Sequence, residues 1–425
     1  MHKPLKKKCL RCHWPFRMYA ASARPSLRQA GRSLAGRVLV RWAVGLAAGL
    51  QVAGCVGGGP PAFREGAGLG EKLEVTRAHV GCPGWVVGVY RGDEVLLEGA
   101  YGLADLERQV PMTLAHRFRV ASFTKPVVAT ALLTLVDQGR VSLEDTLDAH
   151  VPGVPNGDRI TLRMLAQHTS GLPNYIAVPA VQEAFTAEPS RGWSAQELID
   201  MGLASQSYPR GEPGERFAYS NTGYVLLGRV LERIEGKPLS GVLADRVFEP
   251  LGLMGTSYSV DIEMAKPHSE GYQYGDARGP IYWRGKGDRL YRVTDTSPSM
   301  WHAAGAMVST LADVTRMLRA FREGELVSEA AHVEQMRWFD ADDRLGVDYA
   351  YGLGLAKYQG AIGHSGTTPG YQMTASWWPE EDLTVVILAN LYSSNRREDP
   401  ATAGFYVVMR HVTGRSWAPP TWPGW

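Results

Sequence analysis

A serine and a lysine stand three residues apart at the start of the most apolar helical segment of the chain. The letters ASFTKP, residues 121–126, contain the pattern S-x-x-K with Ser122 and Lys125. On an α-helix such residues share one face, about 5 to 6 Å apart at Cβ, so a lysine amine can reach a serine hydroxyl and activate it as a nucleophile. About one such pair is expected by chance in this composition. The alternative is therefore a helix cap followed by a solvated lysine.

Pro126 places this pair in the first turn of the helix. Proline is tolerated there and not in a helix interior, so we expect the helix to begin near Ser122. Ser122 would then lie at the positive end of the helix dipole, with a backbone N–H directed outward as an oxyanion donor requires. The motif predicts acyl-transfer chemistry at a helix N-terminus.

A second serine, Ser365, competes for the same role. The stretch GHSGTTPG, residues 363–370, is close to the nucleophile elbow G-x-S-x-G but lacks its last glycine. The elbow also needs an acid and a histidine downstream, for which Asp382 and His411 are available. However, the 60 residues after Ser365 predict antiparallel strands and one helix rather than further βα units. We expect Ser365 to be dispensable and Ser122 to be the nucleophile.

Two further motifs follow at long spacings. Tyr219 and Asn221 form Y-x-N about one hundred residues after Ser122, just before an amphipathic helix. His364 and Gly366 form H-x-G on a strand another 143 residues on. Each motif alone is weak, but their order and spacing together carry a strong signal.

With S-x-x-K, Y-x-N and H-x-G in this order, the chain resembles the serine β-lactamase and penicillin-recognising family. The resemblance is to the branch that contains class C β-lactamases, D,D-carboxypeptidases, D-amino-acid peptidases and related esterases. It covers about residues 65–395, with support from ITLRMLAQHTSGLPNY, PGERFAYSNTGYVLLG and AAGAMVSTLADVTRML. Many β-lactamases carry lysine in the third motif, whereas His364 matches peptidase-like and esterase-like members better. The resemblance implies a serine acyl-hydrolase acting on D-amino-acid peptide, β-lactam or ester substrates, peptidoglycan peptides included.

The resemblance also implies a role for each motif residue. Ser122 would attack the carbonyl, and Lys125 and Tyr219 would share the proton transfer; which of the two is the base stays open. A nearby ammonium would lower the pKa of Tyr219 from about 10 and let it accept a proton near neutrality. The backbone N–H groups of Ser122 and Thr367 would bind the oxyanion. Asn221 would orient the substrate amide or the Lys125 amine.

Two histidines and a group of aromatic residues complete the candidates. We expect His364 in the active site rather than as a packed strand histidine, with Gly366 keeping its strand accessible. His168, in HTSG, is expected to stabilise a loop. Five aromatic residues would either line a substrate cleft or pack as core or lid: Tyr272, Tyr274, Tyr282, Trp283 and Trp301.

Strand-like sequence lies on both sides of a helical region. From Gly84, GWVVGVYRGDEVLLEGAYG predicts two strands joined at residues 91–93, preceded by a helix over residues 64–79. YGLGLAKY, AIGHSG, YQMTASWW and LTVVILANL predict the C-terminal strands, the last two joined by a turn at 379–382. Residues 122 to about 320 are mostly helical in period. We therefore predict an α+β fold: an antiparallel sheet built from N- and C-terminal strands, helices on both faces, and a large, mostly helical insertion.

The first 54 residues differ in charge from the rest. They hold eleven Lys and Arg and no Asp or Glu, which leaves 34 basic against 43 acidic side chains, a net charge of −9, in a chain of +2 overall. A basic nucleic-acid surface is therefore not predicted. The apolar run WAVGLAAGLQVAG, residues 42–54, is short for a bilayer span and suits an export signal.

The letters VAGC, residues 52–55, resemble a bacterial lipobox. This predicts a signal peptide over residues 1–54, a lipidated Cys55 with a flexible tether to residue 63, and one catalytic domain over residues 64–420. The protein would then be an exported lipoprotein of the cell envelope, periplasmic or on the outer surface, held to the membrane by its lipid. An uncleaved signal anchor or a coincidence of small residues is the alternative.

The other cysteines predict neither a cofactor nor a disulfide. Cys9, Cys12 and His13 match the c-type haem pattern, but they lie in a segment expected to stay cytoplasmic or to be removed. After Cys55 only Cys82 remains, which leaves it without a disulfide partner in the exported part. No HExxH or paired Cys/His spacing occurs, so no metal site is predicted.

A function of another class remains open at this point. The same fold could serve a non-catalytic lipoprotein that binds peptidoglycan or a β-lactam as a sensor. A pure receptor has no need for Lys125 or Tyr219, so the intact motifs favour an enzyme.

Overall fold

The computed structural model describes five stretches of the chain: residues 63–205, 211–283, 287–341, 348–392 and 399–415. The predicted signal peptide, the lipobox with Cys55, and the haem-like pattern at Cys9 lie outside these described residues. Within them, no helix combines the length and the apolar character that a bilayer crossing requires.

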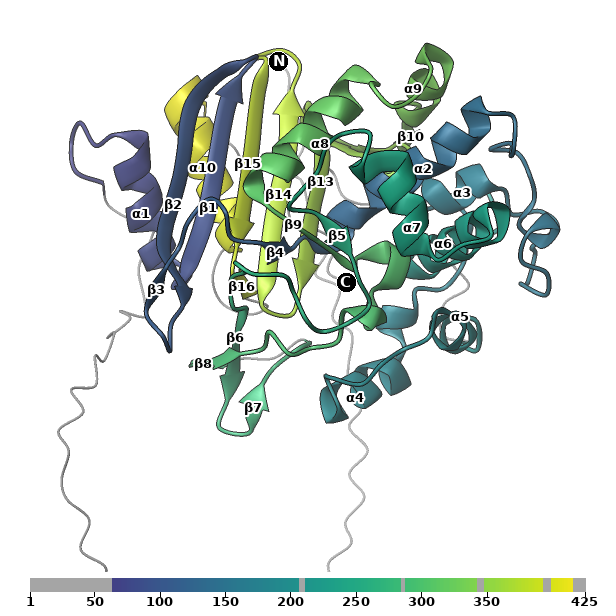
Figure 1. The fold of residues 1–425 in the computed structure, drawn as a ribbon, viewed down its shortest axis with the longest axis horizontal. Helices are drawn as coiled ribbons and strands as arrows, with labels where there is room; N and C mark the ends of the chain where they lie inside the picture. Colours follow the sequence, from purple (N-terminus) through teal and green to yellow (C-terminus); the bar gives the residue numbers. More distant parts are fainter. Residues whose placement is uncertain (1–62, 206–210, 284–286, 342–347, 393–398, 416–425) are drawn as a thin grey trace, which may run out of the picture. The chain divides into compact units, whose positions relative to one another are not determined.

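An antiparallel sheet forms the centre of the fold (Figure 1). In the described part of the chain it has nine strands, in the order β10-β11-β12-β13-β14-β15-β1-β2-β3. Their bounds are Phe339–Asp340 (β10), Tyr349–Tyr351 (β11), Ala356–Tyr358 (β12), Ala361–Thr368 (β13), Tyr371–Trp378 (β14), Leu383–Ala389 (β15), Gly84–Arg91 (β1), Glu94–Asp105 (β2) and Val110–Pro111 (β3). The N-terminal and C-terminal strands meet where Trp85 of β1 pairs with Ala389 of β15. The predicted sheet is confirmed.

Helices cover both faces of this sheet. Helices α1 (Leu69–His79) and α10 (Pro400–Thr413) pack together on one face, and α8 (Leu311–Glu323) packs on the other, in front of the sheet in Figure 1. The central strands β1 and β15 are buried on both sides, which explains why their apolar residues run on continuously instead of alternating. The first helix starts later than predicted because Gly66 takes a left-handed φ of 74° and Gly68 is the N-cap.

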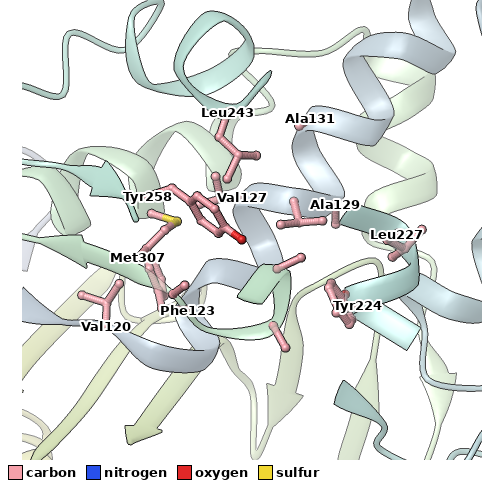
Figure 2. Packing of buried hydrophobic residues seen from close by; sticks show 14 of the residues in the cluster. Val120, Phe123, Val127, Ala129, Ala131, Tyr224, Leu227, Leu243, Tyr258 and Met307 are labelled. Atoms are coloured by element: carbon pink, nitrogen blue, oxygen red, sulfur yellow. The ribbon is translucent and has the colours of Figure 1, made fainter. Parts of the chain in front are cut away.

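The predicted helical insertion lies beside the sheet. Besides α8, its helices are Thr124–Asp137 (α2), Leu162–Ala166 (α3), Pro179–Ala187 (α4), Ala195–Leu203 (α5), Asn221–Glu235 (α6) and Leu239–Leu243 (α7), and the following helix Glu329–Gln335 (α9) packs against α2. Figure 2 shows their shared core, in which Val127 of α2, Leu227 of α6 and Leu243 of α7 are fully buried. Helix α8 has a side-chain cap, since the Thr310 hydroxyl accepts a hydrogen bond from the N–H of Asp313.

Two small sheets connect the insertion to the central sheet. Their strands are Phe118–Arg119 (β4), Met307–Ser309 (β9) and Ser257–Tyr258 (β5) in one, and Leu391–Tyr392 (β16), Tyr272–Asp276 (β6), Gly279–Pro280 (β7) and Arg289–Arg292 (β8) in the other. The first of them borders the S-x-x-K motif, because the N–H of Val120 donates to the carbonyl of Met307 at 3.0 Å. This small sheet therefore sets where the chain enters α2.

Candidate active site

Ser122 lies in a single 3-10 turn, η1 (Ala121–Phe123), immediately before α2. The α-helix itself begins at Thr124, with Pro126 in its first turn, close to the predicted start. Ala121 has a φ of 47°, a left-handed conformation that residues other than glycine rarely adopt. Backbone strain of this kind clusters at functional sites, where the surrounding structure holds it in place.

The hydroxyl of Thr124 holds this strained turn. It donates to the carbonyl of Ala121 at 2.7 Å and accepts the N–H of Met307 on β9 at 3.2 Å. The Thr124 side chain is fully buried, so both bonds are shielded from water. Thr124 was not among the predicted residues, because its second partner lies 183 residues away and leaves no local pattern.

Lys125 is buried against Ser122 and is not a solvated lysine. Its side chain is 0% exposed, and its Nζ lies 3.0 Å from Ser122 Oγ and 2.8 Å from the carbonyl oxygen of Ala304. Burial lowers the pKa of Lys125 well below its usual value, because the charged ammonium loses its hydration. A neutral amine at this distance can accept the proton of the Ser122 hydroxyl.

Tyr219 contacts Ser122 through its phenol group. The Tyr219 hydroxyl lies 3.1 Å from Ser122 Oγ. Burial raises the pKa of Tyr219 well above its usual value, so the expectation of a lowered pKa is wrong. The physical reason is that burial strips a phenolate of the hydration it needs, and burial also lowers the pKa of Lys125, which disfavours the ammonium that was expected to stabilise the phenolate. Lys125 is therefore better suited as the base, and Tyr219 as a hydrogen-bond donor.

Asn221 is the first residue of α6, and a second asparagine, Asn174, orients its side-chain amide. The Oδ1 of Asn174 accepts the backbone N–H of Asn221 at 3.2 Å and lies 3.3 Å from the Nδ2 of the same residue. Because the backbone N–H can bond only to an acceptor, this contact fixes the orientation of both amides. The Oδ1 of Asn221 therefore points away from Asn174. Asn174, in the stretch GLPNY, was not among the predicted residues.

Strand β13 carries the third motif alongside the nucleophile turn. A Cβ on Gly366 would lie 2.2 Å from the carbonyl oxygen of Val120, so only glycine allows the two backbones to approach this closely. Strand β12 pairs with β13 only as far as Gly363, while residues 364–368 pair with β14. Thr367 is half-buried on this segment, whose backbone runs beside η1.

His364 is buried on β13, in hydrogen-bond contact with Tyr351 of β11. Its side chain is 7% exposed, and both ring nitrogens are engaged within the protein. Nδ1 donates to the carbonyl of Ser365, which can only accept, so Nε2 accepts from the Tyr351 hydroxyl at 2.9 Å. Burial lowers the pKa of His364 to about 3, which keeps it neutral. The His364 ring thereby fixes the hydroxyl of Tyr351 of β11.

Ser365 lies on the other face of β13. Side chains alternate along a strand, and Ser365 lines a cavity of about 60 Å³ between the sheet and α10 together with Thr374 and Ser376 of β14. Ser122 and Ser365 are therefore on opposite sides of the same strand.

The aromatic residues of segment 270–301 pack as core. Tyr272 and Tyr274 belong to the apolar cluster between the sheet and α10. The other three surround Phe185 of α4 at ring-centroid distances of 5.2 to 6.5 Å: Tyr282, Trp283 and Trp301. Tyr272 and Tyr282 are buried, whereas Tyr274, Trp283 and Trp301 are half-buried and pack against the core.

No cluster of three or more His, Cys, Asp or Glu suited to a metal ion occurs among the residues whose structure is described. Cys82 is buried as a single thiol. The groups around Ser122 are an amine, a phenol and backbone amides, which suit acyl transfer through a covalent serine intermediate.

An antiparallel sheet with a helical insertion, in which S-x-x-K, Y-x-N and H-x-G lie side by side, defines the β-lactamase and penicillin-binding class of folds. The chain belongs to the beta-lactamase family, whose match spans residues 71–405.

Known proteins of this family resemble the chain over most of its length. It is 26% identical over 324 residues to penicillin-binding protein 4* of Bacillus subtilis strain 168, covering 72% of this chain and 67% of that protein. A crystal structure of a D-stereospecific amidohydrolase from Streptomyces sp. has a TM-score of 0.69 at 28% identity, covering 81% of this chain and 97% of that one. D-amino acid amidase from Ochrobactrum anthropi SV3, in complex with L-phenylalanine, has a TM-score of 0.68 at 27% identity, covering 80% and 97%.

Proposed function

We propose that the protein is a serine acyl-hydrolase that forms an acyl-enzyme on Ser122. The observation that carries this proposal is the pair of contacts on Ser122 Oγ, with the buried Lys125 amine at 3.0 Å and the Tyr219 hydroxyl at 3.1 Å. A nucleophile with a neutral base on one side and a proton donor on the other has what acyl transfer needs. The same burial of Lys125 argues against the alternative of a non-catalytic sensor, which gains nothing from a desolvated lysine.

Acylation starts with proton transfer from Ser122 to Lys125. As Oγ bonds to the substrate carbonyl carbon, the hydroxyl proton moves to Nζ and the carbonyl π electrons move to the oxygen. The backbone N–H groups of Ser122 and Thr367 are proposed to bind this oxyanion. The new ammonium of Lys125 lies 4.8 Å from the centre of the Tyr219 ring, which stabilises its charge.

Collapse of the tetrahedral intermediate expels the leaving group. The bond from the carbonyl carbon to the leaving nitrogen or oxygen breaks, and Tyr219 donates its proton to that atom. The Lys125 ammonium then returns a proton to Tyr219, so both groups regain their starting state. Water attacks the acyl-enzyme in the second half, with Lys125 again as the base, and releases the acid and Ser122.

We propose D-amino-acid amides and peptides, peptidoglycan peptides included, as the first substrates to test, ahead of β-lactams and simple esters. Two lines support this order. Solved structures of a D-stereospecific amidohydrolase and a D-amino acid amidase resemble the chain over about four fifths of its length. His364 stands at the position where many β-lactamases of the family carry lysine.

A substrate panel tests the proposed function. Purified protein and its Ser122→Ala variant are incubated with D- and L-phenylalanine amide, a D-Ala-D-Ala peptide, a fluorescent penicillin and a short-chain p-nitrophenyl ester. We expect turnover or covalent labelling that depends on Ser122, with the D-amide preferred over the L-amide. Rapid release of penicillin would indicate a β-lactamase, and a stable adduct a penicillin-binding peptidase. If no compound gives a Ser122-dependent signal, the enzyme proposal is rejected.

We further propose that the protein is an envelope lipoprotein anchored through Cys55. The lipobox-like letters VAGC and the apolar run before them support this. In a bacterial host, Cys55→Ala is expected to move the protein from the membrane fraction to the soluble fraction and to remove a mass increment of acyl chains from its N-terminus. An unchanged membrane fraction without acyl mass in either protein would contradict the anchor.

A further inference from the structure

His168 lies directly beneath the ring of Tyr219. The two ring centroids are 4.1 Å apart with an interplanar angle of 33°, and the His168 side chain is 1% exposed. Its backbone has a φ of 59°, in the left-handed region that residues other than glycine rarely occupy. A buried polar residue held in an unfavourable backbone conformation points to a role beyond filling space.

His168 also binds the backbone on both sides of Tyr219. Its Nδ1 accepts the N–H of Ser220 at 3.2 Å, and its carbonyl oxygen accepts the N–H of Ala218 at 2.7 Å. One residue therefore binds the N–H groups of both sequence neighbours of Tyr219 and packs against the Tyr219 ring between them. These three contacts leave Tyr219 little freedom to tilt or slide.

The surroundings of the His168 ring determine its tautomer and its protonation state. Because Nδ1 accepts a hydrogen bond, the proton lies on Nε2, for which the described residues provide no hydrogen-bond partner. The ring is enclosed by Phe217, Tyr224 and Tyr351 in addition to Tyr219. Burial lowers the pKa of His168 well below its usual value, so Nδ1 remains an acceptor.

We propose that His168 is a positioning residue for the acylation reaction, which sets the Tyr219 hydroxyl at its place beside Ser122 Oγ. The inference rests on the proposed function, because it gives His168 the role of positioning Tyr219, the proton donor of that reaction. His168 also packs on Tyr351 at 4.7 Å, and Tyr351 bonds to His364 of β13. The buried His168 ring thereby connects the two motifs: it packs on Tyr219 of Y-x-N and on Tyr351, which bonds to His364 of H-x-G.

A double-mutant cycle with Tyr219→Phe tests this role. His168→Phe keeps an aromatic ring but removes the acceptor for Ser220, whereas His168→Asn keeps an acceptor near Nδ1 and tolerates a left-handed backbone. We expect His168→Phe to lower kcat/KM about 10- to 100-fold, mostly through kcat, with partial rescue in His168→Asn. In the Tyr219→Phe background the same change should cost less than about 3-fold, because its target hydroxyl is already gone.

Matched controls separate positioning from general stability. His116 is another buried histidine, bonded through Nδ1 to Thr113, and His116→Phe should leave kcat/KM unchanged in both backgrounds. Thermal unfolding of every variant shows which ones fold. An equal loss from His168→Phe with and without the Tyr219 hydroxyl would overturn the proposal.

A second measurement decides the question without turnover. In protein labelled with ¹³Cζ-tyrosine, the Tyr219 resonance is identified by its loss in Tyr219→Phe. His168→Phe keeps a ring beneath Tyr219 but removes the acceptor for Ser220, so it should shift this resonance by displacing the phenol, while His116→Phe should not. A Tyr219 resonance unmoved by His168→Phe overturns the proposal. A wild-type protein that neither turns over nor labels rejects the proposed function alone, and the resonance shift still decides the position of Tyr219.

Discussion

Ser122→Ala is expected to abolish covalent labelling and to lower turnover by more than about 10⁴-fold, because the reaction then has no nucleophile. Its Oγ is the atom on which Lys125 and Tyr219 converge, at 3.0 and 3.1 Å. Labelling is followed by intact-protein mass spectrometry and turnover by product release.

Ser365→Ala provides the matched control on the neighbouring motif. Ser365 lies on the α10 side of β13, in a cavity with Thr374 and Ser376, so this variant should keep most of the activity. The reverse result, with activity lost in Ser365→Ala and kept in Ser122→Ala, would restore the nucleophile-elbow interpretation.

Lys125→Met is expected to lower the rate of acylation about 10²- to 10⁴-fold, which is the usual contribution of a positioned base. Methionine is long and apolar, so it fills the buried space of Lys125 without a basic group. Lys125→Arg should be inactive as well, because a guanidinium does not give up its proton in a protein. Single-turnover labelling measures the acylation step separately from deacylation.

The pH dependence of kcat/KM gives an independent check on Lys125. Only the neutral amine accepts the Ser122 proton, so activity should rise as pH increases through the pKa of Lys125 and then level off. Because burial lowers that pKa well below 10.5, the rise should be complete far below the range in which an exposed lysine titrates. Burial raises the pKa of Tyr219. The activity lost when Tyr219 deprotonates should therefore be lost only above the pH range in which an exposed tyrosine titrates. Activity that still rises near pH 10 would contradict a desolvated Lys125.

Local sequence patterns predicted the reactive pair and the sheet. Helical spacing and Pro126 indicated that Ser122 and Lys125 share one face at a helix start, and the structure has the α-helix starting at Thr124. Apolar runs on both sides of the helical region predicted the strands that now pair between β1 and β15. Both predictions depend on periodicity and turn chemistry, which are properties of residues close together in the sequence.

The supporting contacts of the site could not be predicted in the same way. Thr124 reaches Met307, Asn174 reaches Asn221, and His168 reaches Ser220 across separations of 183, 47 and 52 residues. Such contacts exist only once the fold has brought distant segments together. Nothing in the letters around these residues distinguishes them from ordinary cap or loop residues.

The protonation of Tyr219 shows a second limit of the sequence. A neighbouring lysine suggested a phenolate, because two opposite charges favour each other. Depth of burial decides the balance instead, since desolvation disfavours both the ammonium and the phenolate. The depth of a side chain is a property of the folded chain, and the motif alone does not contain it.

The pairing of β1 with β15 also orders events during synthesis. Trp85 pairs with Ala389, so the edge of β1 that binds β15 stays uncovered until almost the whole chain has been synthesised. Contacts of such long sequence separation slow folding, and an uncovered strand edge pairs readily with other chains. Chains interrupted before Leu383 would therefore expose the edge of β1 and aggregate, even though Ser122, Lys125 and Tyr219 were all already present.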